Sequence, residues 1–241
     1  LLLDEPTDND VVVQIEWSGI STGTEKLLWN GTMPDFPGMG YPLVPGYESV
    51  GRITRVGKKA KLDLHQRVFV PGAKCFGDVK GLFGGAASHV VVPSDRVVAL
   101  PEKIGEEGVL LALAATAYHV TQGKKSAQPD LIIGHGVLGR LIARIAVMLG
   151  HQPVVWEIDA DRMSGAEGYT VLHPCDDEEN KYKNICDASG QVSILNKLIS
   201  RLQHGGEITL AGFYDKDIQF NFPAAFMKEA RLRIAAQWAP E

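Results

Sequence analysis

The spacing G-x-G-x-x-G occurs in the run Gly134-His135-Gly136-Val137-Leu138-Gly139. Glycine at the first position permits a tight turn. At the second it lets a diphosphate approach the backbone at a helix N-terminus, and at the third it lets that helix pack close to a sheet. An apolar segment precedes the run and a segment with helical periodicity follows it, which is the context that the pattern requires. We therefore predict that the loop binds a dinucleotide through Gly134, Gly136, Val137, Leu138 and Gly139.

A carboxylate lies where the next apolar strand ends, at Glu157, roughly 20 residues after the loop. Such a carboxylate can accept hydrogen bonds from the adenosine ribose hydroxyls and repel a 2′-phosphate, so we predict NAD as the cofactor. Arg162 leaves NADP open as an alternative. We expect the side chain of His135 to point outward from the loop and to have no catalytic role.

The elements that position this loop belong to an alternating pattern of strands and helices, which begins near Gly108. The pattern predicts a doubly wound parallel sheet. We expect strands at 131–133, 154–156, 184–188, 207–212 and 232–236, and helices at 136–149, 193–202 and 224–229, with Gly205-Gly206 as a break.

Residues 1 to about 100 have a different texture, because short apolar runs are punctuated by Gly and Pro. This predicts a β-rich domain with strands at 11–17, 49–56, 68–71 and 88–92. The fold class is therefore α/β, with a β-rich domain at 1–104 and a dinucleotide-binding domain at 105–241. Because the chain opens without Met and ends soon after a strand-like run, we expect both ends of the native protein to extend further.

Composition excludes several classes of function. A net charge of -5 without a dense basic run argues against a nucleic-acid partner. The most apolar stretch, 109–117, is far shorter than a membrane span, so we expect no transmembrane segment. Three scattered cysteines without a C-x-x-C pair fit reduced thiols and a cytoplasmic location.

Four segments resemble the medium-chain dehydrogenase/reductase superfamily in order and spacing: Ser18 to Glu25, Pro45 to Glu48, Gly51 to Gly57 and Arg67 to Pro71. The resemblance covers the whole chain. It implies a GroES-like catalytic domain followed by a Rossmann domain, an alcohol dehydrogenase activity and, as in many members, a homo-oligomer.

In zinc-dependent members the first of these motifs holds a Cys ligand and the second a His-Glu pair. Here the corresponding residues are Ser21 and Tyr47, while Glu48 is retained. A hydroxyl and a phenol are poor zinc ligands beside thiolate and imidazole, so we expect no catalytic metal. Glu48 is either a functional carboxylate or a buried group that orders its loop.

Oxidation of an alcohol needs a base for the hydroxyl proton, and without zinc the side chains must provide it. The resemblance places Ser21 and Tyr47 at the reaction centre, where they could hydrogen-bond the substrate oxygen. Thr24 flanks the position of a proton-relay hydroxyl, and Glu25 or Lys26 could extend the relay to solvent. The alternative is a turn held by hydroxyl-backbone bonds.

Within the superfamily, further runs resemble the bacteriochlorophyllide a dehydrogenase family: 16–29, 42–51, 81–88, 111–117, 156–157, 166–169 and 211–214. This resemblance implies that NAD oxidises the 3-(1-hydroxyethyl) group of a chlorophyllide-type tetrapyrrole to 3-acetyl, in bacteriochlorophyll a biosynthesis. Two alternatives remain: a zinc-free NAD(P)H-dependent reductase of quinones or enones, and a non-catalytic protein that binds dinucleotide or pigment.

Large apolar side chains on Gly- and Pro-rich loops are unusual unless they cover something flat or fill the core. Candidates for substrate contact are Trp29, Phe36, Met39 and Phe83. A platform for the macrocycle and a plug of the core are equally open interpretations.

Overall fold

A computed structural model describes residues 1–35, 37–122, 128–179 and 181–235. The chain divides into two units, Leu1–Ala112 and Leu113–Glu241. Segment 105–112 belongs to the first unit, because Val109 and Ala112 pack against the buried Val50 and Phe69. The sequence predicts a domain boundary between residues 104 and 105, which is earlier in the chain than the division after Ala112. The predicted boundary stays a prediction.

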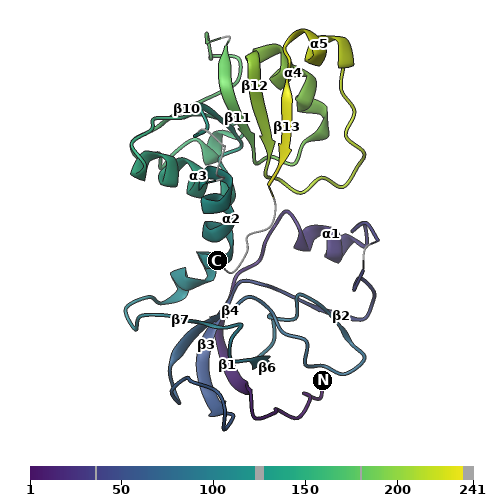
Figure 1. Ribbon diagram of the computed structural model, residues 1–241, viewed down its shortest axis with the longest axis vertical. Coiled ribbons are helices and arrows are strands. Elements are labelled where there is room, and N and C mark those ends of the chain that lie inside the picture. The colour runs from purple at the N-terminus through teal and green to yellow at the C-terminus, as the bar shows by residue number, and fades with distance from the viewer. Residues whose placement is uncertain (36, 123–127, 180, 236–241) are drawn as a thin grey trace. The chain divides into compact units, whose positions relative to one another are not determined.

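The first unit is built on a five-stranded antiparallel sheet with the order β6-β1-β3-β4-β7 (Figure 1). These strands are β1 Asp10–Ser18, β3 Ser49–Val56, β4 Arg67–Val70, β6 His89–Pro93 and β7 Val98–Ala99. A separate parallel pair consists of β2 Leu43–Pro45 and β5 Lys80–Leu82. The loop after β2 carries Tyr47, one of the predicted catalytic residues. The core is aliphatic: Val11, Val13, Ile53 and Val68 are all fully buried. This confirms the predicted β-rich domain.

A short helix, α1 Glu25–Asn30, interrupts this β-rich unit. It ends at Gly31, whose φ of 67° is the left-handed conformation that closes many helices. The helix packs through Leu28 onto Met33 and Leu82. No long helical period marks it in the sequence, and at six residues it depends on this packing for stability.

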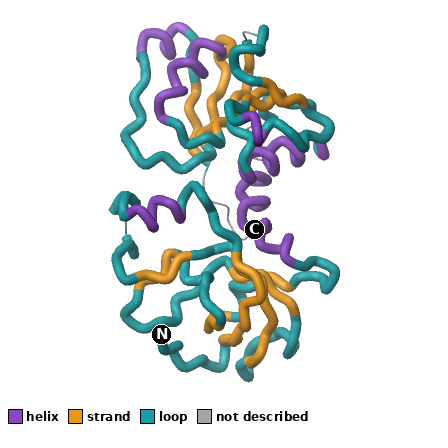
Figure 2. The backbone as a smooth tube through the Cα atoms, turned by 180° about the vertical axis from the view of Figure 1, so that it is seen from behind, coloured by secondary structure: helices purple, strands orange, loops and turns teal. Residues whose placement is uncertain are grey.

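The second unit contains a six-stranded parallel sheet with the order β10-β9-β8-β11-β12-β13. Figure 2 shows strands in orange and helices in purple. Its strands are β8 Leu131–Ile133, β9 Val154–Trp156, β10 Thr170–Leu172, β11 Tyr182–Asp187, β12 Leu202–Leu210 and β13 Arg231–Ile234. The order reverses between β8 and β11, and ligands of such sheets bind at the carboxyl ends of strands near this reversal. The predicted doubly wound sheet is confirmed.

Helices cover both faces of this sheet. They are α2 Leu111–Gln122, α3 Val137–Met148, α4 Leu195–Arg201 and α5 Phe222–Met227. Leu131 and Ile133 pack on one face with residues of α4 and α5, while Ile132 packs on the other with residues of α2 and α3. Because alternate residues of β8 point to opposite faces and both faces are covered, the strand is apolar throughout.

One predicted break is wrong. The strand β12 continues through Gly205-Gly206 and does not begin after it. Gly205 adopts a φ of 70°, and the pairing with β11 shifts register between Tyr182 and Asn184. The glycine pair therefore accommodates an irregularity inside a strand and does not end the element. Within the described residues, no helix is long and apolar enough to cross a bilayer.

Candidate active site

Three of the predicted catalytic residues meet in the first unit. The hydroxyls of Ser21 and Thr24 lie near the hydroxyl of Tyr47 and lower its pKa. Ser21 and Thr24 come from the loop before α1, and Tyr47 follows β2. The structure thus joins hydroxyl groups that the sequence separates by more than 20 residues.

Local geometry explains how these side chains are presented. Thr24 occupies the N-cap of α1 but its side chain makes no capping bond, although Thr at this position usually accepts one from the helix backbone. Its hydroxyl lies near that of Tyr47 and lowers the pKa of the phenol. Tyr47 is held by Gly46, whose φ is 98° and whose Cβ, if it had one, would lie 2.7 Å from the backbone nitrogen of Ala86.

The phenol of Tyr47 is protonated at neutral pH. Burial raises its pKa above the usual value, the bonds from Ser21 and Thr24 lower it, and the negative charges of Glu48 and Glu25 raise it again, with a net increase. A neutral phenol can donate a hydrogen bond to an oxygen that becomes a carbonyl, but it is a poor base by itself.

Glu48 is buried, with only 3% of its surface exposed. Its Oε1 has no hydrogen-bond partner among the described residues. Burial, aided by the charge of Glu25, raises the pKa of Glu48 to about 7. Gly19 covers the carboxylate: its N–H donates to the Glu48 carbonyl at 2.7 Å, and a Cβ on Gly19 would lie 3.0 Å from Glu48 Cβ.

The predicted substrate residues lie in different surroundings. Phe83 meets Tyr47 edge to face, with ring centroids 5.5 Å apart, and is 44% exposed. Trp29 projects from α1 and is 90% exposed. Met39 packs against the small apolar cluster around Leu28, as a core plug would. Phe36 lies outside the described residues.

The donor set does not suit the zinc ion that many relatives of this fold use. Ser21 and Tyr47 bring a hydroxyl and a phenol, and Glu48 brings a carboxylate that is partly protonated near neutral pH. Zinc in catalytic sites is bound by imidazole, thiolate and ionised carboxylate. Among the described residues, no three His, Cys, Asp or Glu side chains converge on one point.

In the second unit, the glycines of the loop 134–139 have distinct roles. Gly134 has a φ of 92°, which favours glycine. A Cβ on Gly139 would lie 3.0 Å from the carbonyl carbon of Gly134, so this position requires close packing. A Cβ on Gly136 would have no neighbour within 4 Å among the described residues. No contact with those residues explains glycine at 136, and the open space fits the approach of a diphosphate to the N-terminus of α3. Val137 and Leu138 begin that helix.

Glu157 directly follows β9 and is 7% exposed. Its Oε2 accepts from the N–H of His135 at 2.8 Å, and its Oε1 accepts from the N–H groups of Ile158 and Asp159 at 2.8 and 2.9 Å. Burial would raise the pKa of Glu157, but these three bonds and the charge of Arg162 lower it overall. The carboxylate is therefore ionised and tied to the glycine loop. Since two carboxylate oxygens offer about four acceptor positions, one remains for a ligand hydroxyl.

The expectation that His135 points outward is wrong. Its side chain is fully buried. The Nδ1 atom lies 2.6 Å from the Arg162 carbonyl oxygen and must donate to it, so Nε2 accepts from the Tyr169 hydroxyl at 2.7 Å. Burial lowers the pKa of His135. The neutral imidazole thus makes two hydrogen bonds, which connect the glycine loop to the segment after Glu157.

Sequence reasoning missed a further buried carboxylate, Asp187, at the carboxyl end of β11. Its Oδ1 accepts from the N–H and hydroxyl of Ser189, and its Oδ2 accepts from the Tyr214 hydroxyl at 2.7 Å. Burial raises the pKa of Asp187 despite these bonds. An acidic residue at the end of an apolar strand was the available signal, because ligand-facing loops start there.

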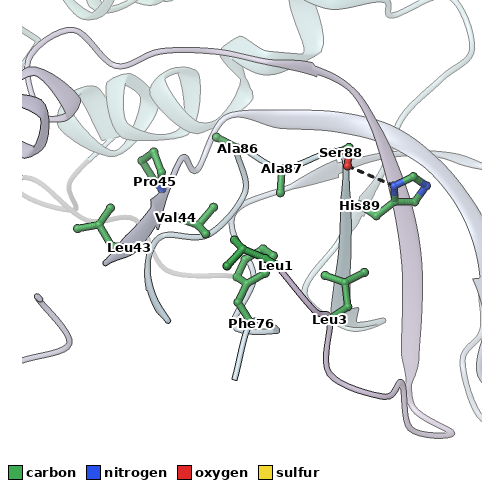
Figure 3. Close-up of a pocket in the computed structure, with 10 residues that line it drawn as sticks. All are labelled: Leu1, Leu3, Leu43, Val44, Pro45, Phe76, Ala86, Ala87, Ser88 and His89. Carbon is green, nitrogen blue, oxygen red and sulfur yellow. Dashed lines mark hydrogen bonds between the residues drawn. The ribbon is translucent and has the colours of Figure 1, made fainter. Parts of the chain in front are cut away.

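The first unit also has a pocket of about 560 Å³ (Figure 3). It is lined by Leu1, Leu3, Leu43, Val44, Pro45, Phe76, Ala86, Ala87, Ser88 and His89. The predicted catalytic and substrate residues are not among those lining it.

Comparison with known proteins identifies the family of this chain. Residues 7–102 match the alcohol dehydrogenase GroES-like domain family. The 2-desacetyl-2-hydroxyethyl bacteriochlorophyllide A dehydrogenase of Cereibacter sphaeroides is 52% identical over 99% of this chain and 77% of its own length. The enzyme of that name from Rhodobacter capsulatus is 53% identical over 99% and 76%. The chain belongs to this family of dehydrogenases. The resemblance noted in its sequence is confirmed, as is its status as an alcohol dehydrogenase.

Solved structures agree on the fold. The dehydrogenase superposes on 2R,3R-butanediol dehydrogenase from Bacillus subtilis with a TM-score of 0.81 at 19% identity, covering 100% of this chain and 80% of the other. An alcohol dehydrogenase from E. coli complexed with NADH gives 0.78 at 21% identity, covering 96% and 77%. S. aureus TarJ in complex with NADPH gives 0.76 at 18% identity, covering 96% and 74%. Solved structures with this fold thus include one bound to NADH and one bound to NADPH.

We predict that Gly136→Val abolishes dinucleotide binding and leaves the fold intact, because its side chain would fill open space that the diphosphate needs. Calorimetry with NAD⁺ and urea unfolding measure the two effects. Gly139→Ala is the matched control: its Cβ would meet the Gly134 backbone, so it should lower the free energy of unfolding by about 1–3 kcal/mol. Unchanged NAD⁺ affinity in a folded Gly136→Val protein would refute the assigned loop.

Proposed function

We propose that this dehydrogenase oxidises the 3-(1-hydroxyethyl) group of a chlorophyllide-type tetrapyrrole to 3-acetyl, in bacteriochlorophyll a biosynthesis. The observation that carries the proposal is the identity of 52–53% over 99% of the chain to two dehydrogenases named for that substrate. At such identity, residues throughout both units are shared with enzymes of one activity.

The hydroxyl cluster suits the alcohol end of the substrate. We assign the neutral Tyr47 and Ser21 to hydrogen bonds with the alcohol oxygen, which strengthen as that oxygen becomes a carbonyl. Thr24 holds the phenol from the other side and supplies a second hydroxyl for proton movement. Bound NAD⁺ supplies the acceptor for the carbinol hydride. Glu48 is the nearby carboxylate whose protonation changes near neutral pH.

Exposed aromatic side chains suit the flat face of a macrocycle. Phe83 offers a half-exposed ring in contact with Tyr47, and Trp29 offers a fully projecting one. We assign Phe83 to substrate contact beside the reacting group and Trp29 to the periphery. Met39 is partly buried in a cluster of its own unit, so its contribution is to support this surface.

The substrate assignment predicts a specific assay. Purified protein with NAD⁺ and a 3-(1-hydroxyethyl) chlorophyllide should form NADH and 3-acetyl pigment in equal amounts, followed by absorbance and mass. A simple quinone or enone with NADH is the comparison, because a reductase of those compounds has the same two domains. Reduction of quinone without oxidation of the pigment would overturn the proposal, and no hydride transfer in either assay would favour a binding protein.

We predict a preference for NAD⁺ over NADP⁺ of roughly 1–3 kcal/mol, because the ionised Glu157 would face a 2′-phosphate. Glu157→Gln should narrow the preference for NAD⁺ over NADP⁺. The glutamine side chain keeps one oxygen that can accept from the loop N–H groups. Glu178→Ala, which removes an exposed carboxylate of the same unit, should leave it unchanged. The ratio of kcat/KM for the two cofactors is the measurement. Equal or better kinetics of the unmodified enzyme with NADP⁺ would contradict the assignment.

We predict that activity survives removal of metal by a chelator, since Ser21 and Tyr47 stand where two strong zinc ligands would be needed. Tyr47→Phe should then lower kcat by roughly 10², because polarisation of the alcohol oxygen depends on hydrogen bonds. Tyr118→Phe, which removes an exposed phenol hydroxyl on α2, is the control. Stoichiometric zinc in the active protein, with activity lost on chelation and restored by zinc, would refute a metal-free mechanism.

A cytoplasmic location remains a proposal, supported by the three free cysteines Cys75, Cys175 and Cys186. Assembly into a homo-oligomer likewise stays a prediction.

A further inference from the structure

Two carboxylates lie beside the hydroxyl cluster, and neither is satisfied by hydrogen bonds. The Oε1 atoms of Glu25 and Glu48 are both buried and have no partner among the described residues. Glu48 is 97% buried by surface area, since 3% of it is exposed. Burying a carboxylate without a cation or a full set of donors is costly, so the arrangement calls for an explanation beyond packing.

The two carboxylates are coupled to each other and to the phenol. The charge of Glu25 acts on Glu48, and the charges of both act on Tyr47. Glu25 directly follows Thr24 at the start of α1, and Glu48 directly follows Tyr47 after β2, so each carboxylate adjoins a member of the hydroxyl cluster in the sequence. Gly19, which covers Glu48 from the end of β1, carries no charge. Glu25 is thus the charged residue that acts on Glu48. The other titratable neighbour, Tyr47, is neutral.

The hydroxyl cluster needs a proton acceptor that it does not contain. The phenol of Tyr47 keeps its proton at neutral pH, and serine and threonine hydroxyls are weaker acids still. An efficient general base has a pKa near the working pH. Of the two carboxylates, Glu48 has a pKa of about 7, whereas that of Glu25 is raised by burial alone.

We propose that Glu25 and Glu48 form a proton-holding pair. Glu48 takes up the proton released by the alcohol, and the negative charge of Glu25 increases the affinity of Glu48 for that proton. This rests on the proposed function. The carbinol C–H bond breaks and its hydrogen passes with both bonding electrons, as hydride, to the oxidised dinucleotide, while the O–H bond breaks and its electron pair forms the C=O double bond. The proton moves by way of the hydroxyl cluster to the Glu48 carboxylate, which becomes a carboxylic acid and later releases the proton to solvent.

The first test needs neither substrate nor cofactor. Infrared difference spectra of the protein between pH 5 and 9 should contain a carboxylic-acid carbonyl band that disappears with a midpoint of about 7. Glu48→Gln should remove this band. Glu25→Gln should move its midpoint to lower pH by about 0.5 to 1 unit, because a negative neighbour is lost. The exposed-carboxylate variant Glu5→Gln should leave band and midpoint unchanged. No band titrating near neutral pH, or an unshifted midpoint in Glu25→Gln, would overturn the pair.

The second test uses single-turnover oxidation with saturating NAD⁺. The rate should rise with pH up to a midpoint near that of the infrared band, and Glu25→Gln should shift this midpoint in the same direction. Glu48→Gln should lower the rate by about 10² and flatten the profile. An active enzyme whose profile is unchanged in both variants would refute proton uptake by Glu48. If the unmodified protein does not oxidise the pigment, the proposed function fails, while the infrared result still decides whether the pair exists.

Discussion

Burial of the Glu48 carboxylate is the constraint on which the proposed chemistry of the first unit depends. A pKa raised from 4.5 to about 7 corresponds to about 3 kcal/mol of preference for the protonated form. Because the folded state binds this proton more tightly than the unfolded chain, the cost is absent at low pH. It grows as pH rises from the unfolded value toward 7. The aliphatic sheet around Val11, Val13 and Ile53 must therefore stabilise a unit that carries an unfavourable group at its edge. Unfavourable burial of this kind is found where a group's protonation is used.

The N-cap of the neighbouring helix α1 also lacks a stabilising interaction. A Thr in the N-cap position normally stabilises its helix by about 1 kcal/mol through a bond to the helix backbone. Thr24 makes no such bond, and its hydroxyl lies near that of Tyr47. The helix α1 is only six residues long and is kept in place by Leu28 instead. Local stability is thus reduced where hydroxyl groups are directed toward one point.

How much the sequence predicts depends on how local the cause is. The glycine loop was predictable, because the needs of Gly134 and Gly139 arise from a turn and a helix start a few residues apart. Residue identities at the hydroxyl cluster followed from family resemblance, but the coupling of Glu25 to Glu48 depends on tertiary burial that no spacing encodes. The orientation of His135 was predicted wrongly for a related reason. Its partners, Arg162 and Tyr169, lie about 30 residues along the chain, beyond the reach of a loop rule.

In the proposed metal-free mechanism, hydrogen bonds take the place of a metal ion, and this changes what the protein must control. A zinc ion lowers the pKa of a bound alcohol directly, so the base that finally receives the proton can be distant and weak. Hydrogen bonds from Tyr47 and Ser21 stabilise negative charge less, which leaves more of the barrier to proton transfer itself. The acceptor must then have a pKa matched to the medium, and an ordinary exposed carboxylate, near 4.3, is too acidic by more than two units. Burial corrects that mismatch at Glu48 without any added ion. In the proposed mechanism, Ser21 and Tyr47 at the positions of metal ligands and the raised pKa of the retained carboxylate, Glu48, are therefore complementary features.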